Sequence, residues 1–274
     1  MHFPRLPDWL IYVAAVIALL VAAIGRQERA DAPAPPPPVP GEAGVPLSAY
    51  LPFDPARILK VPHKVEPYTG TAFSVSEAGV WLTAGHVLEG CRQAAVIVAE
   101  GRGVQATFTI DRGSDIAVLR TQGGAPPLPL ADATPQPGMR GFHPGYPLGR
   151  SGEVTSRLLG PDRLAGESRG DPGAAVLAWT EVGRTDGMEG LLDGLSGAPV
   201  LDDAGRVVGL TLAESPRRGR LYTTAPGAIQ AALKAARVRA SFSQGQAVNV
   251  ENYGRVADTL RRDLRVAKVV CLRT

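Results

Sequence analysis

Residues 190–200 read GLLDGLSGAPV and set a serine, Ser196, between Gly194 and Gly197. Glycine tolerates backbone conformations that a side chain forbids, so neighbouring N–H groups are free to converge on one point. A nucleophilic serine needs such a point, because the oxyanion of a tetrahedral intermediate must be stabilised there. We therefore identify Ser196 as a candidate nucleophile and the N–H groups of Gly194 and Ser196 as candidate oxyanion donors. Taken alone, the stretch also fits an ordinary Gly–Ser turn.

Strand-like sequence follows the serine. Residues 198–201 read APVL, residues 202–205 read DDAG and residues 206–210 read RVVGL. Two apolar runs around a short glycine-containing loop predict a β-hairpin directly after the candidate nucleophile.

Two upstream blocks supply the partners that a serine nucleophile needs. Residues 83–88 read TAGHVL and residues 113–119 read GSDIAVL, which gives the order His86, Asp115, Ser196. This is one of the chain orders known for a Ser-His-Asp triad, with His as general base and Asp as the group that orients it. Asp111 competes with Asp115 for that role. It begins a turn-like Asp-Arg-Gly-Ser, whereas Asp115 leads into an apolar strand that suits a desolvated carboxylate.

Together the three blocks resemble the chymotrypsin-like (trypsin-like) serine proteases, and among them the bacterial HtrA-like (Deg) branch. That branch carries T-A-x-H-V, D-[IL]-A-V-L and G-x-S-G-[GA]-P-[LV], and the resemblance spans roughly residues 66–230. It implies an all-β fold of two six-stranded barrels and a serine endopeptidase that works through an acyl-enzyme without a cofactor. HtrA-like proteins usually continue into a PDZ domain, for which residues 238–274 are too few.

Composition agrees with many short strands and excludes several other classes. The 32 glycines and 25 prolines favour tight turns over long helices. A net charge of +3 is too small to indicate nucleic-acid binding. There is no CxxC motif or histidine-rich tract, so no metal site is expected. The expected partners are protein or peptide substrates, and a homo-oligomer stays open.

The chain divides into five predicted segments. These are an N-terminal tail (1–8), a membrane anchor or signal peptide (9–25), a Pro-rich linker (26–46), a protease domain (47–237) with barrels at about 66–125 and 138–225, and a C-terminal extension (238–274) with a helix at 253–264 and a strand at 266–272.

The N-terminal segment favours a membrane location. The run from Trp9 to Ile24 is uncharged, which is short for a spanning helix and long for a signal-peptide core. We expect a single-pass anchor in a bacterial inner membrane with the protease domain in the periplasm; the alternative is secretion after signal cleavage. The proline-rich residues that follow predict an extended spacer with no part in a core.

The substrate pocket is only partly predicted. By the resemblance, residues 209–214 line it, and we expect Leu210, Thr211 and Leu212 to bind substrate. Leu195 stands where digestive-type relatives carry an aspartate that pairs with a newly cut N-terminus. This departure leaves a rival function open, a catalytically impaired pseudoprotease that acts as an envelope interaction or sensor module.

Cys91 and Cys271 are the two cysteines of the chain. In an exported domain a single pair is a candidate disulfide, whereas two small buried thiols are the alternative in a reducing compartment. A disulfide would retain the short C-terminal extension beside the first barrel.

Overall fold

The computed structural model describes residues 9, 13, 15–17, 32–34, 58–60, 69–164, 174–215 and 219–273. The expected membrane segment at 9–25 and linker at 26–46 lie mostly outside these ranges. Among the residues described, no helix combines the length and apolar character that a bilayer crossing requires.

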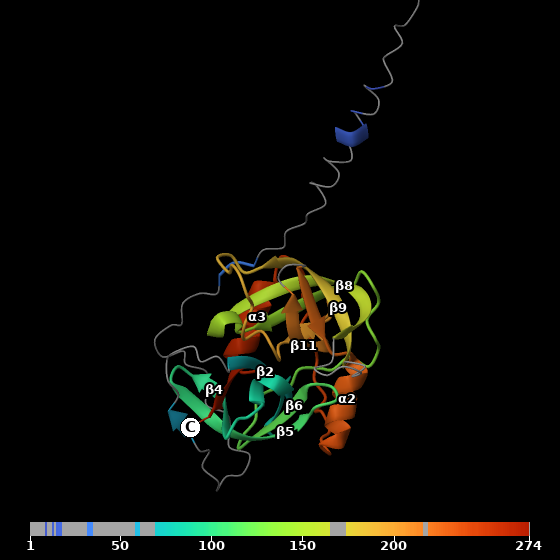
Figure 1. Ribbon diagram of the computed structural model, residues 1–274. Helices are drawn as coiled ribbons and strands as arrows, with labels where there is room; N and C mark the ends of the chain where they lie inside the picture. Colours follow the sequence, from blue (N-terminus) through green and yellow to red (C-terminus); the bar gives the residue numbers. More distant parts are fainter. Residues whose placement is uncertain are drawn as a thin grey trace, which may run out of the picture.

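The first barrel is a closed antiparallel sheet with the strand order β5-β4-β13-β2-β3-β6, completed by pairing between β5 and β6. In Figure 1 its strands β4, β5 and β6 lie below β8, β9 and β11 of the second barrel. Strand β1 (Ile58–Lys60) pairs with β5 outside this ring. The ring strands are β2 (Thr69–Ser76), β3 (Val80–Ala84), β4 (Gln93–Ala99), β5 (Arg102–Asp111), β6 (Ile116–Thr121) and β13 (Val266–Leu272).

The second barrel closes in the order β10-β11-β12-β9-β8-β7. Its strands are β7 (Arg140–Gly145), β8 (Gly152–Leu164), β9 (Ala174–Arg184), β10 (Pro199–Leu201), β11 (Val207–Ser215) and β12 (Arg220–Thr223). The helices are α2 (Pro226–Ala235) and α3 (Tyr253–Arg262), with 3-10 turns η1 (Gly85–Leu88) and η2 (Pro147–Gly149). The expectation of an all-β fold with two six-stranded barrels is therefore confirmed.

Each barrel is built around one fully buried tryptophan. Trp81 lies in the core of the first barrel and Trp179 in that of the second. Each indole N–H donates to a buried threonine hydroxyl, Thr121 at 3.0 Å and Thr223 at 2.9 Å. A buried indole needs such a partner, so each ring fills its barrel without an unpaired polar group.

The C-terminal segment is part of the first barrel rather than an extension beside it. Strand β13 lies between β2 and β4, with Val266 opposite Phe73 and Val269 opposite Val96. Val266 and Val269 are both fully buried. The prediction of a helix and a strand in this segment is correct, but the barrel limits of 66–125 omit a strand without which the sheet does not close.

A disulfide joins Cys91, which follows η1, to Cys271 in β13, with 5.4 Å between the Cα atoms. It closes a loop with a sequence separation of 180 residues. In the chain-entropy account, loops of a hundred residues or more contribute at most about 5 kcal/mol. The disulfide joins β13 to the segment that follows His86.

Part of the predicted linker packs against the protease domain. Ala32 is fully buried and forms a parallel bridge with Thr185. The Asp186 N–H donates to the Ala32 carbonyl at 3.0 Å, and Pro33 lies against Gly254 of α3. The expectation that the linker contributes nothing to a core is therefore wrong for Ala32, whereas Pro33 is exposed.

Candidate active site

Ser196 lies on the turn between Leu195 and β10, where the two barrels meet. Its carbonyl accepts a hydrogen bond from the Thr71 N–H of β2 at 2.9 Å. The following residue, Gly197, has a φ of 89° and donates its N–H to the Thr211 carbonyl of β11 at 2.7 Å. A Cβ at Gly197 would collide with the Thr71 carbonyl, so only glycine allows the serine turn to approach β2 this closely.

His86 and Asp115 are brought together from two neighbouring strands of the first barrel. His86 lies in η1 after β3, and Asp115 directly precedes β6, which pairs with β3. One carboxylate oxygen of Asp115 lies 2.7 Å from His86 Nδ1, and the other accepts the His86 backbone N–H at 2.8 Å. The Gly85 N–H also donates to the Asp115 carbonyl at 2.8 Å. This arrangement fixes both the position of the ring and the nitrogen that faces the carboxylate.

Asp111, the competing carboxylate, is engaged elsewhere. Its oxygens accept the Gly113 N–H at 3.1 Å and the Ser114 hydroxyl at 2.7 Å, within its own exposed turn. Asp115 is thus the carboxylate that contacts His86. Its side chain is 32% exposed, so it is less desolvated than the sequence indicated.

Ser196 and the His86 turn both pack on Gly70 at the start of β2. A Cβ built on Gly70 would lie 2.7 Å from the Val87 side chain and 3.1 Å from the Ser196 carbonyl. The Ser196 hydroxyl donates to the Leu212 carbonyl at 3.3 Å. Among the described residues, this hydroxyl bonds to Leu212 and not to His86. A hydrogen bond between a nucleophile and its base is often long or poorly aligned before substrate binds.

The backbone around Ser196 leaves two N–H groups free. The Leu195 N–H donates to the Leu192 carbonyl at 2.9 Å, and the Ala198 N–H donates to the Leu195 carbonyl at 2.9 Å. In the part of the chain that the structure describes, the N–H groups of Gly194 and Ser196 have no hydrogen-bond acceptor. Two free donors, one on the serine itself and one two residues before it, fit the requirement for stabilising an oxyanion.

Leu195 supports this turn by packing instead of by charge. Its side chain is 2% exposed and belongs to the core cluster around Trp179. A Cβ built on Gly145 of β7 would lie 2.8 Å from Leu195 Cδ1, which shows how closely β7 covers this leucine. The aspartate-based pairing of digestive-type proteases is therefore replaced by burial of an apolar side chain.

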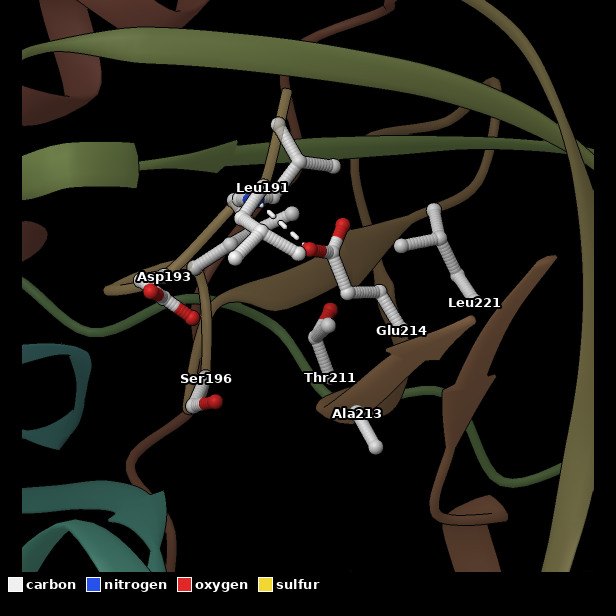
Figure 2. Close-up of a pocket in the computed structure, with 9 residues that line it drawn as sticks. Leu191, Asp193, Ser196, Thr211, Ala213, Glu214 and Leu221 are labelled. Atoms are coloured by element: carbon white, nitrogen blue, oxygen red, sulfur yellow. Dashed lines mark hydrogen bonds between the residues drawn. The ribbon is translucent and has the colours of Figure 1, made fainter. Parts of the chain in front are cut away.

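A pocket of about 230 Å³ opens beside the serine. Figure 2 shows the Ser196 hydroxyl directed toward it, with Glu214 on the facing strand β11. The lining residues are Leu191, Leu192, Asp193, Leu195, Ser196, Thr211, Ala213, Glu214 and Leu221.

Of the three residues expected to bind substrate, one lines this pocket. Thr211 lines the pocket, whereas Leu210 and Leu212 are buried in the core, because successive side chains of a strand point to opposite faces. The alternate residue Ala213 belongs to the lining, as the same alternation would have indicated.

Glu214 lies in the stretch 209–214 that was expected to line the pocket, but it was not among the three residues expected to bind substrate. Its carboxylate accepts the Leu192 N–H at 2.7 Å (Figure 2). Partial burial raises the pKa of Glu214, and the Leu192 hydrogen bond opposes that shift. The pocket therefore combines an apolar wall with a partly desolvated carboxyl group.

A second serine–histidine pair lies inside the second barrel. His143 Nε2 is 2.7 Å from the Ser156 hydroxyl, and Nδ1 is 3.0 Å from the Thr211 hydroxyl. His143 and Ser156 are both fully buried, so no substrate reaches them. Burial lowers the pKa of His143 from 6.5 to about 3. The pair is a neutral structural bridge.

This buried histidine predicts how stability depends on pH. Between pH 6.5 and about 3 the unfolded state binds a proton at His143 that the folded state rejects. The contribution of neutral His143 to the free energy of unfolding is therefore fully present above pH 6.5. As the pH drops below 6.5, the free energy of unfolding falls by up to about 1.4 kcal/mol per pH unit. Urea unfolding at neutral and acidic pH measures this slope, and His143→Gln should reduce it. An equal acid loss in wild type and variant would contradict the assignment.

Comparisons with known proteins agree with this fold. Residues 70–210 match the family described as trypsin-like peptidase domain. A sequence comparison with curated proteins gave no significant match. Among solved structures, the chain is similar to the active form of the Rv3671c protease from M. tuberculosis, with 24% identity, a TM-score of 0.51, and coverage of 66% of this chain and 76% of the other. The inactive form of the same protease gives 24% identity, a TM-score of 0.50, and coverage of 64% and 91%.

Proposed function

This chain belongs to the trypsin-like peptidase family, and from that premise we propose that it is a serine endopeptidase acting through Ser196, His86 and Asp115. The observation that carries the proposal is the double hydrogen bond of the Asp115 carboxylate to His86, on the turn that packs with Ser196 against Gly70. A carboxylate on Nδ1 keeps the proton there and leaves Nε2 as the base.

The proposed reaction has two halves. Ser196 Oγ attacks the scissile carbonyl carbon while His86 Nε2 takes the hydroxyl proton, and the new oxyanion is stabilised by the N–H groups of Gly194 and Ser196. The C–N bond then breaks, and His86 returns the proton to the leaving amine, which leaves an acyl-enzyme on Ser196. Water, deprotonated by His86, cleaves the ester and restores the hydroxyl.

The rival function is a pseudoprotease, and the Ser196 hydrogen bond to the Leu212 carbonyl is the observation that favours it. A fluorophosphonate probe separates the two, because it reacts with an activated serine and needs no knowledge of the substrate. The endopeptidase proposal expects covalent labelling of a single peptide that contains Ser196. Intact, folded protein that takes up no label would support the rival.

We also propose that residues 9–25 anchor the protease domain on the outer side of a bacterial inner membrane, where its substrates are exported or envelope proteins. The support is the uncharged run from Trp9 to Ile24 and the disulfide between Cys91 and Cys271, a bond typical of oxidising compartments.

The anchor predicts a fractionation result. Full-length protein should stay with membranes through a carbonate wash, whereas protein that lacks residues 1–30 should be soluble and folded. The truncation keeps Ala32, because that residue is buried against Thr185. A soluble mature protein whose sequence begins near residue 24 or 26 would instead identify a cleaved signal peptide.

A further inference from the structure

The loop from Gly145 to Gly152, between β7 and β8, controls one of the two free N–H groups beside Ser196. The Leu148 N–H donates to the Asp193 carbonyl. In a trans peptide the C=O and N–H groups point in opposite directions. Fixing the Asp193 carbonyl toward this loop therefore turns the Gly194 N–H away from the loop, as an oxyanion donor requires.

The same loop is joined to a threonine of the first barrel. Thr71 Oγ1 donates to the Gly194 carbonyl at 2.8 Å and accepts the Tyr146 N–H at 3.0 Å. The two peptide groups on either side of Gly194 thus both depend on the position of the Gly145–Gly152 loop. If this loop moves, the serine turn loses the contact that orients its Asp193 carbonyl.

Arg261 of helix α3 holds both ends of the loop. Its Nη1 group lies 3.4 Å from the Gly145 carbonyl and 3.5 Å from the Gly152 carbonyl, two residues that face each other across β7 and β8. The side chain is 6% exposed, so these contacts are shielded from water. Lys268 of β13 adds a contact of 3.5 Å to the Gly149 carbonyl.

Carboxylates on both sides keep the guanidinium of Arg261 in place. Its Nη2 group donates to Glu153 at the start of β8 and, at 2.6 Å, to Asp258 of the same helix. The Thr185 hydroxyl donates to the second oxygen of Glu153 at 2.6 Å. A planar guanidinium can satisfy two carbonyls and two carboxylates at once, which a lysine ammonium cannot reproduce.

We propose that Arg261 is a positioning residue for catalysis: through the Gly145–Gly152 loop, the C-terminal helix keeps the Gly194 N–H directed at the oxyanion. This inference rests on the proposed function. It also accounts for Leu195, since a chain without the aspartate of digestive-type proteases needs another means of ordering the serine turn. Helix α3 orders the serine turn through Arg261.

The test compares Arg261→Lys with Val256→Ala, a truncation of a buried residue on the same helix whose side chain has no polar atom that could bond to the loop. Both variants lose stability, which thermal unfolding measures. At a temperature where all proteins are folded, Arg261→Lys should react with a fluorophosphonate about 10- to 100-fold more slowly than wild type, because one oxyanion donor is misplaced. Val256→Ala should react at the wild-type rate.

A second variant tests the inference if Arg261→Lys does not fold. In the double variant Arg261→Met with Glu153→Gln, the arginine is removed without leaving its buried carboxylate charged, and labelling should again be slow. Arg261 variants that label as fast as Val256→Ala would overturn the inference while the endopeptidase proposal stands. A wild-type protein that does not label at all would instead overturn the proposed function.

Discussion

Replacement of Ser196 by alanine is expected to lower peptide hydrolysis by about 10⁴- to 10⁶-fold and to abolish fluorophosphonate labelling. The hydroxyl oxygen is the atom that would bond to the substrate carbonyl carbon, and the variant has no substitute for it. Folding should be unaffected, because the contacts of the turn are made by backbone groups, including the Ser196 carbonyl and the Gly197 N–H. Labelling, hydrolysis of casein and thermal unfolding measure the three effects.

Ser156→Ala is the matched control. It removes the hydroxyl that contacts His143, the other serine–histidine pair of the described chain. A buried imidazole nitrogen without its partner should cost about 1–3 kcal/mol of stability. Labelling of the folded Ser156→Ala protein should remain. Retained hydrolysis by Ser196→Ala, or its loss in Ser156→Ala, would place the nucleophile elsewhere.

Asp115→Asn is expected to reduce turnover by about 10⁴-fold with little change in structure. The asparagine oxygen can still accept the His86 backbone N–H, but its NH₂ group would then donate to His86 Nδ1. The ring proton would be driven to Nε2, the nitrogen that has to accept the Ser196 proton. Asp115 has a φ of 52°, a conformation that asparagine adopts readily, so the backbone should tolerate the change.

Asp111→Asn provides the comparison for this prediction. Asp111 lies in the exposed turn that precedes Asp115 and bonds to Gly113 and Ser114. Its substitution should leave turnover near the wild-type level. Steady-state kinetics with one peptide substrate for both variants decides the matter. If Asp111→Asn were the slower enzyme, the carboxylate that orients His86 would have been misidentified.

Much of the fold could be predicted because local sequence determines it. The hairpin after Ser196 is present as β10 and β11, with Pro199 opposite Leu210 and Leu201 opposite Val207. The two six-stranded barrels follow from apolar runs separated by turn residues. The contact between His86 and Asp115 was also within reach, since each residue stands at the end of a strand and those strands pair.

The remaining features depend on contacts between distant segments. Strand β13 reads as an isolated apolar run, and nothing local indicates that it enters between β2 and β4. The buried Arg261 reads as one of several surface arginines, because its partners Gly145, Gly152 and Glu153 are more than a hundred positions away. Leu210 and Leu212 were wrongly expected in the pocket for a smaller reason: a shift of one residue along a strand reverses the face to which a side chain points.

The place of β13 also determines when the first barrel can close during synthesis. The ribosome produces β2, β3, β4, β5 and β6 first, but β2 and β4 are joined only through the strand at Val266–Leu272. His86 and Asp115 therefore belong to an open sheet until β13 has been translated. The strands of the second barrel end at Thr223, so this barrel can close before β13 has been made. The pair that the proposed function uses as base and orienting acid is in this way completed only once β13 is in place.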